Sequence, residues 1–116
     1  MSICESKLTD FGFATKCCEK DDFMKKCGTP GYMGPEILRE EEYGCKVDIF
    51  SAGVVLFSLL TGNEPWAGKS TKDTLKLNKK ATIQFEYKDW KDLSFSVRHL
   101  VKCMLFKEPS ERYNIK

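Results

Sequence analysis

The sequence is poor in the features that mark several functional classes. It holds one histidine, and its six cysteines form no Cys-x-x-Cys pair, which argues against a zinc site. No uncharged run reaches the roughly 20 residues that a membrane helix needs. Basic and acidic residues number 19 and 17, so we expect neither nucleic acid nor membrane as a partner. The first residues lack an apolar signal core, which favours a cytoplasmic protein with free thiols.

The longest apolar stretch lies in the middle of the chain. From Ile49 to Asn63 no residue is charged, and large apolar side chains fall on every side of a helix. Such a helix must be buried all round, so the pattern predicts a central core helix that ends at Gly62, a good C-terminal cap. Asp48 lies near the start of this helix. It either stabilises the helix N-terminus, where the helix dipole favours a carboxylate, or it holds another segment in place. A chain of 116 residues forms one domain at most.

Further helices are predicted on both sides of this stretch. Pro35 is well placed as the first residue of a short helix that runs to about Glu40. Ser70 has the type and position of an N-cap for a helix that runs to about Lys80 and carries Leu75. That helix has few apolar side chains, so we expect it to be exposed.

The remainder of the chain is less regular. Residues 83–93 contain scattered aromatic anchors and no clear period. From Ser94 onward apolar residues recur at helical spacing, which predicts an amphipathic helix that Pro109 ends. Near the N-terminus, two short strands hinged at Gly12 fit the pattern. Too few helices are present to surround the central one, which suggests that the chain is part of a larger fold.

An ordered series of short motifs runs through the chain. In sequence they are Asp10-Phe11-Gly12, Gly28-Thr29-Pro30-x-Tyr32, Gly34-Pro35-Glu36, Asp48-x-x-Ser51-x-Gly53 and Arg112 after Pro109. In this order they resemble the C-terminal lobe of a eukaryotic serine/threonine protein kinase, most like the calcium/calmodulin-dependent group. The resemblance implies that residues 1–116 are a partial protein kinase domain of mainly α fold. It would run from a short β hairpin at Asp-Phe-Gly through the activation segment to the central, exposed and amphipathic helices.

The resemblance assigns the first motif to the nucleotide. It implies ATP and Mg²⁺ as cofactors, with Asp10, Phe11 and Gly12 on the cofactor side. Asp10 resembles the Asp that binds Mg²⁺, and a hard cation takes a carboxylate oxygen. Phe11 would pack inward, while Gly12 allows the backbone to turn.

The later motifs resemble parts that bind substrate and hold the lobe together. A protein substrate carrying Ser or Thr would dock on a platform made of Gly28, Thr29, Pro30, Tyr32 and Met33. Glu36 and Arg112 resemble the buried ion pair of the family, and Asp48 resembles the Asp that hydrogen-bonds the catalytic loop. Gly34 stands where the family usually has Ala.

Several parts of the kinase machinery are absent from the sequence. It has no Gly-x-Gly-x-x-Gly loop, no Val-Ala-x-Lys and no His-Arg-Asp, so no catalytic residue is present, and both the ATP-binding lobe and the catalytic loop are missing. The family implies ATP-dependent phosphorylation of Ser or Thr, and we expect the isolated chain to be inactive. The alternative is a non-catalytic kinase-like interaction or scaffold module. Apolar faces around Val54, Val55 and Phe57 would make the isolated chain aggregate.

Overall fold

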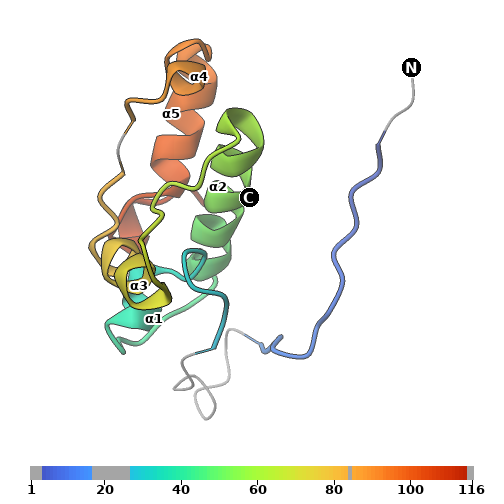
Figure 1. Cartoon of the computed structure of the whole chain (residues 1–116). Helices are drawn as coiled ribbons and strands as arrows, with labels where there is room; N and C mark the ends of the chain where they lie inside the picture. Colours follow the sequence, from blue (N-terminus) through green and yellow to red (C-terminus); the bar gives the residue numbers. More distant parts are fainter. Residues whose placement is uncertain (1–3, 17–26, 84, 115–116) are drawn as a thin grey trace.

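The computed structural model describes residues 4–16, 27–83 and 85–114, and their regular structure is helical. The elements are α1 (Pro35–Leu38), α2 (Lys46–Thr61), α3 (Thr71–Lys80), α4 (Lys88–Lys91), α5 (Phe95–Met104) and the 3-10 turn η1 (Pro109–Glu111). Figure 1 shows α5 beside α2, with α1 and α3 grouped at one end of this pair. The N-terminal segment runs apart from the helices. The mainly α expectation is therefore confirmed for the described residues.

The central helix α2 forms where the apolar stretch predicts it, but one face is open. Phe50, Val54 and Phe57 are almost fully buried, whereas Leu59 is 79% exposed and Val55 is 46% exposed. Gly62 ends the helix with φ of 68°, and its N–H donates to Ser58 O at 2.9 Å. The apolar pattern alone predicted burial on all sides, but α4 and α5 cover one side of α2 only, which agrees with the expectation that too few helices are present to surround it.

Aromatic rings fill the core on the covered side of α2. The Phe57 ring lies 5.3 Å from Trp90 and 6.4 Å from Phe85, between ring centroids. Trp90 is 2% exposed and belongs to α4, a short helix that the sequence reading of residues 83–93 as irregular missed. The reason is that α4 is a single turn, too short to display a helical period.

Helices α2 and α5 approach closely at Gly53. A Cβ atom placed there would lie 2.8 Å from Met104 Cβ and 3.0 Å from Leu105 Cδ2. Ser94 caps α5 as expected and accepts from Val97 N at 3.4 Å. The helix stops at Met104, and Pro109 begins η1 instead of ending α5.

A second cluster joins α1 to α3. Its buried members are Met33, Ile37 and Leu38, and Leu75 of α3 packs against them. Helix α3 is therefore anchored on one face, where the sequence suggested general exposure. Its Ser70 cap is confirmed, with Asp73 N donating to Ser70 Oγ at 3.2 Å.

The first described segment, residues 4–16, contains no strand. The hairpin expected there is therefore wrong for this chain, since a strand requires a neighbouring backbone and the side chains here are exposed. The expectation of free thiols holds for Cys4, Cys27 and Cys103, while Cys45 is disulfide-bonded. Across the described ranges, no helix has the length and apolar character to cross a membrane.

Candidate functional site

The turn-rich segment after residue 27 adopts a backbone that requires glycine. Gly28 has φ of 135° and Gly31 has φ of 93°, both in the region that side chains disfavour. A tight turn follows, in which Tyr32 N donates to Thr29 O at 3.1 Å. Thr29 is exposed, while Met33 is 7% exposed. The predicted platform residues therefore form one turn, in which Thr29 faces solvent and Met33 is buried.

Side chains from three other elements hold this segment by its backbone. Trp66 Nε1 donates to Gly31 O at 2.7 Å, and Gly31 N donates to Asn78 Oδ1 at 3.1 Å. Asn78 Nδ2 donates in turn to Met33 O at 2.9 Å, and Asn78 is fully buried. Ser51 Oγ of α2 donates to Tyr32 O at 2.8 Å. Buried backbone groups must be paired, so these bonds fix the shape of the segment.

Asn78 is the site residue that sequence reasoning missed. The available signal was an amide three residues after Leu75, on the inner face of a helix whose other polar residues are mostly lysines. A buried side-chain amide must find both a donor and an acceptor, and Asn78 does so on Gly31 and Met33.

A cavity of about 300 Å³ lies between this segment and α2. Thr29 of the predicted platform and Asp48, which resembles the Asp that hydrogen-bonds the catalytic loop, both line it. The other lining residues come from both described ends of the activation segment, from α1, from the connection between α1 and α2, and from the start of α2: Phe13, Ala14, Thr15, Cys27, Gly28, Tyr32, Met33, Ile37, Tyr43, Gly44, Cys45, Val47 and Ser51. Asp48 is exposed in the first turn of α2.

The Asp-Phe-Gly motif lies away from the packed helices. Asp10 is exposed with φ of 62°, a left-handed conformation, and Ala14 N closes a turn onto Phe11 O at 3.0 Å. Phe11 is 69% exposed, so the prediction that it packs inward is wrong here. The described residues contain no group of three side chains suited to a metal ion.

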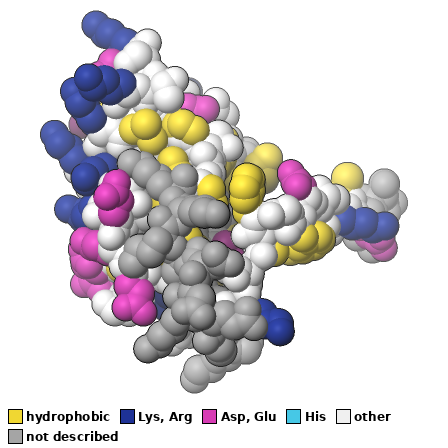
Figure 2. Space-filling view, turned by 90° about the horizontal axis from the view of Figure 1, so that it is seen from below, with side chains coloured by type: hydrophobic (Ala, Val, Ile, Leu, Met, Phe, Trp, Pro, Cys, Tyr) yellow, Lys and Arg dark blue, Asp and Glu magenta, His cyan; other side chains and the backbone are white. Residues whose placement is uncertain are grey.

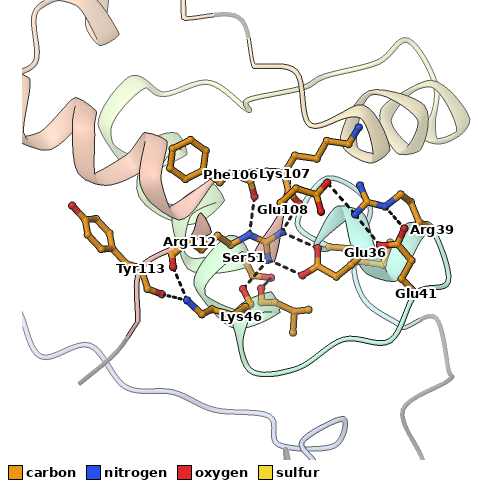
Figure 3. A network of polar contacts seen from close by, with 12 residues as sticks. Glu36, Arg39, Glu41, Lys46, Ser51, Phe106, Lys107, Glu108, Arg112 and Tyr113 are labelled. Carbon is orange, nitrogen blue, oxygen red and sulfur yellow. Dashed lines mark hydrogen bonds and ion pairs between the residues drawn. The ribbon is translucent and has the colours of Figure 1, made fainter. Parts of the chain in front are cut away.

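Glu36 and Arg112 are brought together from opposite ends of the helical region. Two parallel bonds join them, from Nη1 to Oε1 at 2.6 Å and from Nη2 to Oε2 at 2.8 Å (Figure 3). Both side chains are buried, at 1% and 0% exposure. A bidentate pair of this geometry is stronger and more directional than a single contact.

The remaining donors of Arg112 are also used. Nη1 donates to Lys46 O, Nη2 to Lys107 O and Nε to Phe106 O, and the guanidinium lies 4.8 Å from the Phe50 ring centroid. All five N–H groups of the side chain therefore have acceptors. A buried charge is tolerated only with such complete pairing.

Gly34 and the Arg39–Glu41 ion pair lie close to the Glu36–Arg112 pair. A Cβ at Gly34 would lie 2.8 Å from Glu36 Oε2, so glycine leaves room for the carboxylate in this arrangement. Nearer the surface, Arg39 Nε donates to Glu41 Oε1 at 2.8 Å, and this hydrogen bond raises the pKa of Arg39 above its ordinary value.

Comparison with known proteins gives a consistent answer. Residues 3–116 match the family described as protein kinase domain. The chain is 42% identical over 106 residues to the probable serine/threonine-protein kinase 2 of Plasmodium falciparum (isolate K1 / Thailand), covering 91% of this chain and 21% of that protein. It is 39% identical to the serine/threonine-protein kinase zyg-8 of Caenorhabditis elegans, over 93% of this chain and 14% of that protein.

A mammalian relative, the serine/threonine-protein kinase 33 of Bos taurus, is 33% identical over 95% of this chain and 23% of its own length. The chain thus spans less than a quarter of each of these three relatives. Each of the three is named as a serine/threonine-protein kinase. With a match that extends over nearly all of its residues, the chain belongs to the protein kinase family.

Proposed function

We propose that this chain is the part of a serine/threonine kinase C-terminal lobe that follows the catalytic loop. In the whole enzyme it takes part in ATP-dependent phosphorylation of Ser or Thr in protein substrates. Within the family we assign it to the calcium/calmodulin-dependent group, on the motif series from Asp10 to Arg112.

The observation that carries this proposal is the five-donor contact of Arg112. It ties Glu36, three residues beyond the platform, to the carbonyls of residues 46, 106 and 107. A rigid platform is what a transfer reaction needs, because substrate positioning supplies much of the rate. The exposed Thr29 and the cavity beside it then face the position that we assign to a catalytic loop, and Asp48 would bind the backbone of that loop.

Asp10 fits one position of a magnesium site. Mg²⁺ binds proteins through one or two carboxylates, and phosphate oxygens and water complete its six ligands. When bound, the ion offsets charge that develops on the transferred phosphate. Asp10 is the group of this chain that would hold it.

The isolated chain is expected neither to bind ATP measurably nor to transfer phosphate, since its sequence lacks the ATP-covering loop, the nucleotide lysine and the catalytic Asp. The alternative function, a non-catalytic interaction module, is favoured by one observation: Asp10 and Phe11 are exposed and unsupported by the described helices.

A chimera separates these two functions. Residues 3–116 would replace the matching segment of the Plasmodium relative, and transfer of radiolabelled phosphate to a Ser/Thr peptide would be measured. We expect transfer that falls to background with Asp10→Asn and persists with Asp89→Asn, a control at an exposed carboxylate of α4. A folded chimera without transfer would leave the interaction module as the function. Transfer by the isolated chain, purified free of other kinases, would also contradict the proposal.

A further inference from the structure

Positive charge is concentrated on α3 and the two residues that precede it, in an otherwise balanced chain. Residues 69–80 contain five lysines and one aspartate, a net charge of +4, whereas the whole chain carries +2. The rest of the chain is therefore net negative, at −2. The five lysines, which we call the lysine face, are Lys69, Lys72, Lys76, Lys79 and Lys80.

The lysine face is exposed, and no ion pair of the described part of the chain includes one of its charges. All five side chains belong to exposed residues, and the ion pairs that the structure describes involve Arg39 and Arg112. The one acidic residue of the helix, Asp73, is already bound, since Ser70 Oγ donates to its Oδ2 at 2.8 Å. Lys and Arg side chains gather along the left side of the face in Figure 2, the side on which Figure 1 draws α3.

The apolar side of α3 is turned away from this face. Leu75 packs against the cluster around Ile37, and Asn78 is fully buried against the platform backbone. Lys72, Lys76 and Lys79 follow one another at intervals of four and three residues, so they form one row on the outer surface. Leu77, 39% exposed, is the apolar side chain of the helix that faces outward.

We propose that the lysine face docks an acidic segment of a partner protein. Within the lysine face, the axial rise from Lys72 to Lys80 is about 12 Å at 1.5 Å per residue. An extended peptide rises about 3.3 Å per residue, so a run of about four residues rich in Asp or Glu matches its length. The exposed Leu77 gives such a segment one apolar contact.

Other polyanions match the face less well. Insertion into a lipid surface needs an exposed apolar face, and that of α3 is packed against α1. The face holds no arginine to grip phosphate in two places and no aromatic ring on which a base stacks. An acidic protein segment uses the point charges of lysine without either device.

Docking on α3 also places the partner beside the substrate platform. Asn78 binds Gly31 and Met33 from the inner side of the same helix. A partner held by the outer row therefore lies next to the segment that we assign to substrate. The docking itself needs neither nucleotide nor transfer, so its test is independent of the proposed kinase function.

The test is a binding measurement on the full chain. A fluorescent peptide with four glutamates and one leucine is titrated by anisotropy, with a glutamine-for-glutamate peptide as the reference. Lys72→Glu with Lys76→Glu is compared with Lys88→Glu plus Lys91→Glu, an equal charge change at exposed residues of α4. Circular dichroism verifies that both double variants keep the helical content of the parent.

We expect binding of the acidic peptide that weakens as salt is raised, because exposed charges are screened. The affinity of the α3 variant for the acidic peptide should be lower by about tenfold or more. Two attractions are lost and two repulsions are gained, and each has the usual magnitude of a surface charge pair. The α4 variant should change binding by less than about threefold. Equal losses in the two variants, no preference over the glutamine peptide, or stronger binding to phosphatidylserine vesicles or to an oligonucleotide would each overturn the proposal.

Discussion

The segments 28–36 and 4–16 both carry family motifs, yet the chain holds them very differently. In the first, Met33 and Glu36 are 7% and 1% exposed, and side chains of other elements bind the backbone. In the second, Phe11 and Phe13 are 69% and 81% exposed. The contrast teaches that a motif becomes ordered structure where its packing partners lie in the same chain. For the first segment those partners are Trp66, Asn78 and Arg112, all downstream.

The largest effect that would sharpen this contrast is expected at Arg112. Arg112→Met leaves the Glu36 carboxylate buried without its partner, which typically costs about 3–5 kcal/mol of unfolding free energy. Urea unfolding followed by the fluorescence of Trp66 and Trp90 measures the change. Arg39→Ala is the control, since that pair is partly exposed and is worth about 1 kcal/mol or less. Equal effects of the two substitutions would contradict the central role of Arg112.

Asn78→Ala should be the next most damaging change. It leaves the buried Gly31 N–H and the Met33 carbonyl without their side-chain partner, at a total cost of about 2–4 kcal/mol. Hydrogen exchange of the Gly31 amide should accelerate, while that of the residue 4–16 amides should not change. Asn63→Ala, which removes only a local bond to Thr61 O, serves as the comparison. Unchanged protection at Gly31 would refute the assigned role of Asn78.

The close contact of α2 with α5 predicts an intermediate effect for Gly53→Ala. Alanine is the better helix former, but its Cβ would press on Met104 and Leu105, at a cost of about 1–3 kcal/mol. The matched control is Gly44→Ala, where an added Cβ meets no atom within 4 Å. A higher melting temperature for Gly53→Ala would show that the two helices separate easily.

The smallest effect on stability is expected at the open face of α2. Leu59→Lys should leave the unfolding free energy within about 0.5 kcal/mol, because Leu59 is 79% exposed. It should raise the fraction of monomer in size-exclusion chromatography, since an exposed apolar patch promotes association. Phe57→Lys, at a fully buried site, should instead unfold the chain. If Leu59→Lys did not reduce aggregation, a surface other than the open face of α2 would be responsible for association.

Much of the helical arrangement could be predicted from the sequence, because its signals are local. The caps at Gly62, Ser70 and Ser94 depend on neighbouring backbone and are found where expected. The single turn of α4 was missed for want of periodicity. The expected exposure of Val54 and Phe57 was wrong, since both are covered; the open face of α2 carries Val55 and Leu59.

The candidate site was predictable only in part. Sequence order picked out Glu36 and Arg112, which the fold joins, but not Asn78, because its position beside Leu75 indicated only burial and its partners are backbone atoms that no sequence pattern names. The hairpin and the inward Phe11 were expected from family resemblance. Neither forms in the described part of the chain, where residues 4–16 contain no strand and Phe11 is 69% exposed.

The contact of Arg112 with Glu36 has a consequence for the order of events during synthesis. The two residues are 76 positions apart, so the pair closes a loop comprising most of the chain. In a nascent chain that has not yet reached residue 112, the Glu36 carboxylate, which is buried in the final fold, has no guanidinium partner. Helices α2 and α3 can form locally while the ribosome is still extending the chain. The packing around Glu36 therefore cannot be completed until residue 112 has left the ribosome, and until then its buried surfaces are open to association with other chains.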